Sequence, residues 1–302
     1  MTPLLLVTGI GPAIWGTTYL VTTELLPPDR PLLASAVRAL PAGLVLTAAA
    51  RALPDRRWLW RSVALGVLNI GAFFPLLFFA AYRLPGGIAA VLGALGPFVV
   101  AALAYPLLKQ RATARTLAAA TAGTAGVALL VLRSSVSLDG YGLLAAAAAV
   151  LTMALGTVLG RRWGLPELTG GLRPLLAVAG WQLGIGGLLL VPVTLLVEGL
   201  PAAVTWQNVS GYGYLTLFGA IVAYPLWFRG VTRLSAPRVS LLTLLSPVVA
   251  TALGWLVLGQ SLTGWQLAGA LLVLAAVAAG TTRPTVKRVV GVPVTQPALS
   301  RT

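Results

Sequence analysis

The chain has 302 residues, of which 58% are hydrophobic and only 9% are charged. Soluble domains carry about 25% charged residues. With a mean hydropathy of +0.92, the chain has too little polar surface to keep a globule of this length in water. The composition therefore excludes a soluble enzyme and indicates that most of the surface faces a lipid bilayer.

The net charge is +15, from 21 basic and 6 acidic residues, an excess that is also typical of nucleic-acid-binding proteins. The basic residues, however, fall in short clusters between long uncharged runs, which is how a polytopic membrane protein distributes its loops. We therefore expect no nucleic-acid partner. The chain has no cysteine, which excludes disulfides and thiolate chemistry.

Charge-free runs of about 20 residues, the length that crosses a bilayer, predict ten transmembrane helices and an all-α polytopic membrane protein. The first span is expected to be retained, because Met1–Leu26 has no basic n-region and no clear cleavage site. The predicted spans are 3–24, 32–50, 62–82, 86–108, 114–132, 140–160, 174–197, 208–228, 236–257 and 263–281.

The basic residues divide unequally between the two sides of the membrane. Seventeen lie on the side that carries the loop after residue 50 and the C-terminal tail, and three, Arg30, Arg83 and Arg133, lie on the other side. Arg38, inside the second predicted span, is counted on neither side. By the positive-inside rule the first side is cytoplasmic, so both termini are predicted to be cytoplasmic.

The two halves of the chain are related by a repeat. Shifted by 150 residues, 75–128 aligns with 225–278 without a gap, and 20 of 54 positions are identical. Each copy contains five spans, an odd number, so the second copy must enter the membrane from the opposite side. We predict a five-helix repeat over 1–135, an inverted one over 136–282, and a disordered basic cytoplasmic tail over 283–302.

Short motifs in these spans carry a resemblance to a known family. They are Trp15-Gly16-Thr17-Thr18, Arg38, the helices with Pro97 and Pro247, Ala154-Leu155-Gly156-Thr157 and Leu258-Gly259-Gln260. With ten spans and an inverted repeat, the combination resembles the EamA-type carriers of the drug/metabolite transporter superfamily. The resemblance implies a bacterial inner-membrane carrier that exports small metabolites, amino acids or related compounds. It also implies a cavity enclosed by spans one to four and six to nine.

One departure from the family pattern affects the expected mechanism. The resemblance implies an acidic residue at the end of the fourth span, and often another at the end of the ninth, but this chain has Gln110 and Gln260 there. A role in energy coupling for those carboxylates cannot be transferred to this chain.

The polar inventory of the spans excludes most enzymatic functions. No predicted span contains an aspartate or a histidine, and the chain has no Gly-x-x-x-x-Gly-Lys-Ser/Thr loop. These absences exclude intramembrane proteolysis, metal-dependent prenyl transfer and ATP coupling. We expect no catalytic residue, no metal and no cofactor, and transport that runs on a gradient.

Arg38 and Glu24 are the charged candidates for binding, coupling or gating. Arg38 lies roughly 10 Å along the second span from Pro31, where a charge usually faces a cavity or a partner. Three interpretations stay open: it snorkels to the outer headgroups, attracts an anionic group of the substrate, or pairs with Glu24 as an outer gate. Glu24 is either an ordinary boundary residue or a carboxylate that changes protonation during transport.

Two polar stripes are further candidates for the cavity wall, although helix packing also explains such stripes. The first span carries Trp15, Thr18 and Thr22 on one face, with Tyr19 beside them, and the ninth carries Ser240, Thr243 and Ser246. The repeat matches the second stripe with Ala90, Gly93 and Gly96 of the fourth span.

The remaining candidates lie at membrane depth in other spans. They are Asn69, Trp181, Gln182 and Tyr224, of which Trp181-Gln182 aligns with Arg38-Ala39 in the other half. Trp227 belongs to the same inventory of polar and aromatic side chains. Pro97 and Pro247 are expected to break their helices, since proline cannot donate the intrahelical hydrogen bond.

Together these features predict a secondary transporter that exports a small organic metabolite by alternating access. A passive facilitator or channel, or a membrane receptor without transport, remains an alternative. Gly156 with Gly160, and Gly180 with Gly184, form small-x-x-x-small faces that would pack helices within one chain or between chains of a homo-oligomer. The expected partners are a small-molecule substrate and the lipid bilayer.

Overall fold

The structure is a computed structural model that describes residues 3–84, 86–131, 139–201 and 203–281. Within these ranges ten helical segments are long and apolar enough to cross a membrane, which confirms the predicted all-α polytopic fold and the number of spans. The tail 283–302, predicted to be disordered, lies outside the described residues.

Six of the ten spans are single α-helices. They are α1 (Pro3–Leu25), α2 (Pro31–Ala50), α7 (Ala114–Val131), α8 (Gly140–Trp163), α9 (Arg173–Val197) and α14 (Gly264–Thr281). In chain order they form spans one, two, five, six, seven and ten.

The other four spans are interrupted near their middle. The third consists of α3 (Arg56–Gly66), the π-helical turn η1 (Val67–Gly71) and α4 (Phe73–Arg83), and the fourth of α5 (Gly86–Ala94) and α6 (Gly96–Leu108). The eighth consists of α10 (Trp206–Thr216), the π-helical turn η2 (Leu217–Val222) and α11 (Ala223–Arg233), and the ninth of α12 (Ala236–Ser240), the 3-10 turn η3 (Leu241–Leu244) and α13 (Leu245–Leu256). Both π-helical turns start at equivalent positions, 150 residues apart.

The third span begins six residues earlier than predicted. The prediction started the span at residue 62, after the basic residues. In the structure α3 begins at Arg56, because the Asp55 carboxylate accepts a hydrogen bond from Trp58 N at 2.6 Å and caps the helix. Arg61 then lies over three tryptophan rings, with centroids between 5.3 and 5.9 Å from its Cζ. The aromatic rings accommodate a charge that the hydropathy pattern placed outside the helix.

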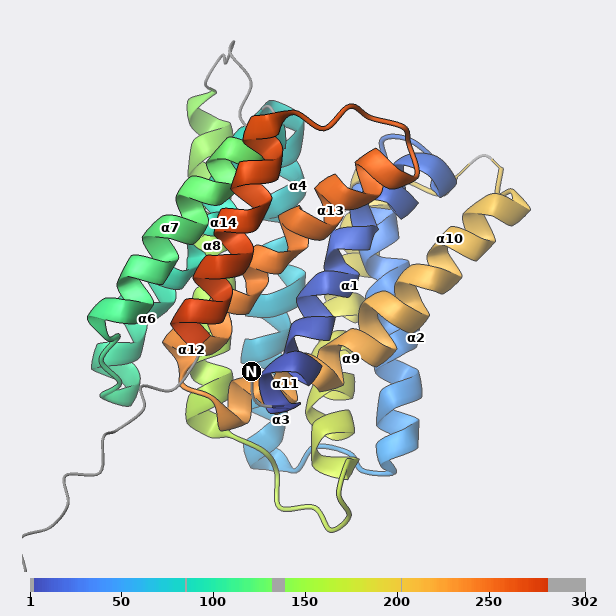
Figure 1. Cartoon of the computed structure of the whole chain (residues 1–302). Coiled ribbons are helices and arrows are strands. Elements are labelled where there is room, and N and C mark those ends of the chain that lie inside the picture. The colour runs from blue at the N-terminus through green and yellow to red at the C-terminus, as the bar shows by residue number, and fades with distance from the viewer. Residues whose placement is uncertain (1–2, 85, 132–138, 202, 282–302) are drawn as a thin grey trace, which may run out of the picture.

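Helix packing follows the repeat (Figure 1). The equivalent helices α2 and α9 pack along each other, and so do α7 and α14, which lie side by side at the edge of the bundle. The contact of α1 with α11 has its counterpart in that of α8 with α4, and the contact of α1 with α13 in that of α8 with α6. Spans two and seven therefore form one tightly packed pair, and spans five and ten form another.

Glycines permit the close crossing of α2 and α9. A Cβ on Gly43 would overlap the backbone of Gly184, and a Cβ on Gly180 would stand 2.6 Å from Thr47 N. On α8, a Cβ on Gly156 would overlap the side chain of Asn69. The faces of Gly180 with Gly184 and of Gly156 are thus occupied within the chain, so an oligomer would need other surfaces.

Polar groups join both ends of the α2 and α9 pair. At one end the Glu198 carboxylate accepts hydrogen bonds from Leu32 N at 2.6 Å and Leu33 N at 2.8 Å, satisfying amide groups that a helix start leaves free. At the other end Arg173 Nε donates to Ala50 O at 3.0 Å. The pair of α2 and α9 is therefore fixed at both ends.

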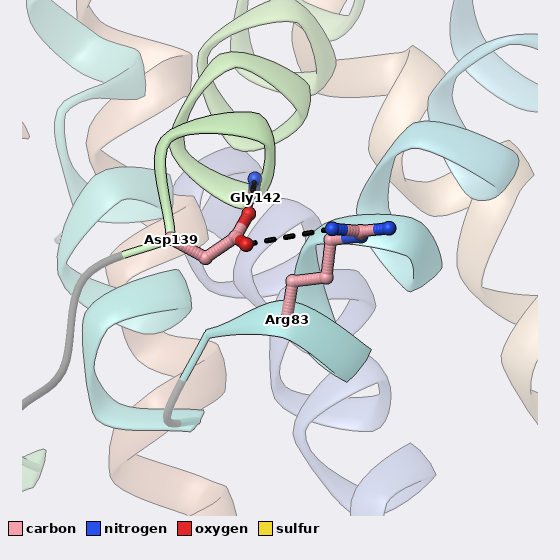
Figure 2. A network of polar contacts seen from close by, with 3 residues as sticks. All are labelled: Arg83, Asp139 and Gly142. Atoms are coloured by element: carbon pink, nitrogen blue, oxygen red, sulfur yellow. Dashed lines mark hydrogen bonds and ion pairs between the residues drawn. The ribbon is translucent and has the colours of Figure 1, made fainter.

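Figure 2 shows a similar connection between spans three and six. Asp139 accepts a hydrogen bond from Gly142 N at 2.7 Å and so caps α8, and its other oxygen lies 3.4 Å from Arg83 Nη1 at the end of α4. Both side chains are partly exposed, so the ion pair itself contributes little and the cap is the main stabilising contact.

Candidate functional site

The π-helical turns η1 and η2 place polar groups at mid-depth. Such turns widen the helix and change the register of its hydrogen bonds, and they occur often at functional sites. Asn69 lies in η1, and its repeat equivalent in η2 is Gly219. Each of these two residues is hydrogen-bonded to α2 or α9: the Gly219 carbonyl accepts from Arg38 of α2, and the Asn69 amide donates to Gln182 of α9.

Arg38 of α2 lies against η2. Its Nη2 donates to Gly219 O at 3.0 Å, and its Cζ lies 5.5 Å from the centroid of the Phe74 ring. The side chain is 7% exposed, has no acidic partner among the described residues, and keeps a buried Nε without a hydrogen-bond partner. In this structure the guanidinium neither snorkels to the outer headgroups nor pairs with Glu24. It is buried between helices with donor capacity to spare, as the interpretation that it attracts an anionic group requires.

Aromatic rings surround this position. Trp15 of α1 also donates to Gly219 O, from Nε1 at 3.1 Å, and its ring lies 5.4 Å from that of Tyr224 and 5.5 Å from that of Trp227. We call Trp15, Phe74, Tyr224 and Trp227 the aromatic cluster. It brings together side chains from spans one, three and eight around the guanidinium of Arg38 from span two.

Asn69 and Gln182 form the counterpart of this contact in the other half. Asn69 Nδ2 donates to Gln182 Oε1 at 2.9 Å, and Gln182 is fully buried. Since Asn69 is the repeat equivalent of Gly219, Gln182 of α9 takes the place that Arg38 of α2 has in the other half. The sequence alignment paired Trp181 with Arg38, so it is one residue out of register with this symmetry.

Trp181 lies in a different part of the molecule from Arg38. Its Nε1 donates to Ala52 O at 3.0 Å in the loop after α2, and its ring lies 6.0 Å from that of Trp58. The side chain thus packs at the end of the bundle where the basic loops gather, in a buried cluster with Ala50 and Val178.

The candidates on α1 are divided between the interior and the surface. Thr18 is half-buried, and its Oγ1 is buried without a hydrogen-bond partner, whereas Tyr19 is 59% exposed. Thr22 is half-buried one turn further on. Glu24 is exposed at the end of the helix, 3.4 Å from Thr23 Oγ1. The outer gate between Glu24 and Arg38 does not form in this structure, because Arg38 binds Gly219.

The polar stripe of the ninth span is largely used within the helix. Ser240 Oγ donates to Pro237 O at 3.1 Å, and Thr243 Oγ1 donates to Ser240 O at 2.7 Å. Ser246 lies where α13 crosses α1, since a Cβ on Gly16 would stand 2.5 Å from Ser246 O. This stripe therefore shapes the helix and its contact with α1.

The fourth and ninth spans are interrupted just before their prolines. α5 ends at Ala94 and α6 begins at Gly96, with Pro97 in its first turn. In the ninth span, the 3-10 turn η3 ends at Leu244, three residues before Pro247. Proline restricts the preceding residues and removes a donor, which explains the position of both interruptions.

The two ends of the bundle differ in how tightly they are packed. We call the end that carries the loops 51–55, 109–113 and 164–172 the basic end, after the basic residues that lie in or beside these loops, and the other the opposite end. At the basic end α11 packs against α8, where Arg161 Nη1 donates to Thr232 O, and α12 packs against α6, where Gln110 Oε1 accepts from Ala236 N at 3.0 Å. Several buried side chains close this region.

The repeat-equivalent helix pairs at the opposite end are apart. Among the described residues, α4 makes no comparable contact with α1, and α5 makes none with α13. A Cβ on Gly93 or Gly96 would meet no atom within 4 Å, and Gly93 is exposed. The structure is therefore closed at the basic end and open at the opposite end.

Two residues of the site were missed from the sequence, Gly219 and Phe74. Phe74 is the repeat equivalent of Tyr224, and Gly219 that of Asn69. Both lie just upstream of the aligned segments, so extending the 150-residue shift toward the N-terminus would have paired them with residues already singled out. Among the described residues, no group of three or more His, Cys, Asp or Glu could hold a metal ion.

The chain is similar to known transporters over most of its length. The model of the EamA-like transporter family matches residues 3–132 and 140–281. Protein PecM of Dickeya dadantii is 48% identical over 265 residues, 88% of each chain. The uncharacterized inner membrane transporter YedA of Escherichia coli is 28% identical, with 83% of this chain and 81% of that one covered. A probable amino-acid metabolite efflux pump of Salmonella typhimurium is 27% identical, with 69% and 71% covered.

A solved crystal structure has the same fold, with a TM-score of 0.77 at 20% sequence identity, covering 93% of this chain and 97% of that chain. The family match and the ten apolar helices make the chain a multi-pass transporter of the bacterial inner membrane rather than an enzyme. This chain belongs to the EamA-like transporter family, within the drug/metabolite transporter superfamily.

Proposed function

We propose that this protein is a secondary transporter that exports a small organic metabolite, an amino acid or related amphipathic compound, by alternating access. The observation that carries the proposal is the difference between the two ends. Among the residues that the structure describes, the contacts that join α11 to α8 and α12 to α6 have no comparable counterparts between α4 and α1 or between α5 and α13 at the opposite end. An inverted repeat allows the second half to adopt the arrangement of the first, which would exchange the open and closed ends.

The substrate site in this proposal is Arg38 with the aromatic cluster and Thr18. A guanidinium binds carboxylates through paired hydrogen bonds, the rings offer an apolar wall, and the free Thr18 hydroxyl offers a further polar contact. Such a site suits a small molecule that has one anionic group and an apolar body. The amino-acid metabolite efflux pump among the relatives supports this class of substrate.

The orientation in this proposal follows from the basic residues. With the basic end in the cytoplasm, both termini are cytoplasmic and the open end faces the periplasm. A fluorescent reporter fused after residue 281 and alkaline phosphatase inserted after Pro28 test this orientation. We expect fluorescence from the first and enzymatic activity from the second; the reverse result would contradict it.

Counterflow in proteoliposomes tests the function. Purified protein is reconstituted with a panel of amino acids and aromatic carboxylates inside, and uptake of the labelled compound is measured. We expect uptake that is stimulated by the same compound on the inner side. Equal flux with and without internal compound would identify a passive facilitator, and binding without flux would identify a receptor; either result overturns the proposal.

A further inference from the structure

Gln110 and Gln260 occupy the same position in the two halves. They are 150 residues apart, and each follows a residue with positive φ, Lys109 at 56° and Gly259 at 62°. The backbone amide of each donates back into its own helix, Gln110 N to Ala104 O at 3.2 Å and Gln260 N to Gly254 O at 3.1 Å. The two glutamines therefore end their spans with the same backbone geometry, one at each end of the bundle.

The side chain of Gln110 makes a contact across the closed end. Its Oε1 accepts a hydrogen bond at 3.0 Å from the backbone N of Ala236, the first residue of α12. Ser235 precedes that helix but makes no capping hydrogen bond through its side chain. Gln110 thus satisfies an amide that the start of a helix leaves free, and it does so by joining span four to span nine.

The side chain of Gln260 makes no such contact at the open end. It is exposed and folds back over Gly254, where a Cβ would stand 2.5 Å from its Oε1. By the 150-residue repeat, its partner would be the amide of Gly86, at the start of α5. The residue before α5 is Pro85, which has no side-chain acceptor to cap that helix.

We propose that Gln110 and Gln260 are alternating latches: Gln110 holds the basic end closed in this state, and Gln260 binds the amide of Gly86 to hold the opposite end closed in the other. The proposal rests on the proposed alternation between two states. Because each helix start can be capped only when spans four and nine meet at that end, the two hydrogen bonds exclude each other. An amide side chain does not titrate between pH 5 and 9, so the latches act independently of pH in that range.

Cysteine cross-linking tests the latches, since the chain has no cysteine of its own. Arg111→Cys with Ser235→Cys reports closure of the basic end, and the equivalent Ser261→Cys with Pro85→Cys reports closure of the opposite end. Each pair is treated in membranes with a bismaleimide reagent. The ratio of the two yields measures the balance between the states without requiring a known substrate.

We expect Gln110→Met, which keeps the side-chain length but removes the acceptor, to shift the ratio about 2- to 10-fold toward closure of the opposite end, as the loss of one net hydrogen bond implies. Gln260→Met should shift it by a similar factor the other way. Gln110→Glu keeps the acceptor and should give the same ratio as the unchanged protein. Gln207→Met, at an exposed position of α10, is the matched control and should also leave the ratio unchanged. In Gly254→Ala the new Cβ would displace the side chain of Gln260 from its present position. This variant should therefore shift the ratio toward closure of the opposite end, as Gln110→Met does.

Shifts in the same direction for Gln110→Met and Gln260→Met, or no shift in either, would overturn the latches. Failure of the function itself gives a different result, because it is read from counterflow. If the opposite-end pair never cross-links, the two-state model fails together with the latches. If both pairs cross-link and the glutamine variants shift the ratio as expected while no solute exchanges, the latches stand and the transport proposal alone fails.

Discussion

Arg38 and Gly219 are joined by a hydrogen bond of 3.0 Å from the guanidinium Nη2 to the backbone carbonyl, which connects α2 to the π-helical turn η2. The same carbonyl accepts from Trp15 Nε1 at 3.1 Å. Two spans of the first half thus converge on one carbonyl of the second half. A substrate that binds the guanidinium would act directly on the contact between the halves.

Arg38→Met should abolish most exchange of an anionic or zwitterionic substrate while the fold persists. Trp15 still satisfies the Gly219 carbonyl, so we expect little change in the thermal unfolding temperature. Hydrogen bonds to a charged group contribute about 1.5–3 kcal/mol, which corresponds to about 10- to 100-fold in exchange rate. Arg38→Lys keeps the charge without the planar fork and should be intermediate. Exchange in proteoliposomes equal to that of the unchanged protein would contradict this role.

The sequence predicts the number of spans well because lipid imposes a simple constraint: each crossing needs about 20 apolar residues. The third span shows where this fails. Its first two turns contain Arg56, Arg57 and Arg61, and only the structure reveals that Arg61 lies on tryptophan rings from two helices. Hydropathy along the chain contains no information about rings that arrive from another span.

The candidate site was also predictable only in part, because the sequence reveals unusual side chains within a span but not the backbone groups that they contact in another span. Arg38 stands out because charged side chains are rare at membrane depth, and Tyr224 because tyrosines are more usual at the membrane interfaces, and the structure places both beside η2. Gly219 does not stand out, since its contribution is a carbonyl that a π-helical turn presents to side chains. Trp181 was selected by an alignment one residue out of register, and the structure places it at the basic end.

Asn69 and Gln182 should be energetically coupled. Asn69→Ala leaves the fully buried Gln182 Oε1 without its donor and should cost about 1–3 kcal/mol. Gln182→Met removes the acceptor with little change in volume. A double-mutant cycle on thermal or denaturant unfolding in detergent should give a coupling energy of about 0.5–1.5 kcal/mol. Additive effects of the two substitutions would show that the hydrogen bond does not form in the membrane.

Glu24→Gln should leave the proton-gradient dependence of transport unchanged. Glu24 is exposed at the end of α1, and Arg38, its proposed gating partner, is bound to Gly219. The carboxylate therefore lies outside the site formed by Arg38 and the aromatic cluster. Uptake into vesicles with and without an imposed pH gradient measures the effect. A gradient dependence lost in Glu24→Gln would restore Glu24 as the coupling residue.

Gly43→Ala should destabilise the pair of α2 and α9, whereas Gly93→Ala should not. A Cβ on Gly43 would overlap the backbone of Gly184, which cannot move aside like the end of a side chain, while a Cβ on Gly93 meets nothing within 4 Å. Forcing apart α2 and α9 should cost about 1–3 kcal/mol, and Gly93→Ala should stay within about 0.5 kcal/mol.

Both substitutions replace glycine by alanine inside a helix, so helix propensity affects them alike and packing alone separates them. Thermal unfolding of purified protein, with size-exclusion profiles before heating, measures the difference. Since Glu198 and Arg173 fix the two ends of the pair, the loss in Gly43→Ala should appear as a lower unfolding temperature of the whole protein. Equal unfolding temperatures for the two variants would mean that α2 and α9 do not cross this closely in the membrane.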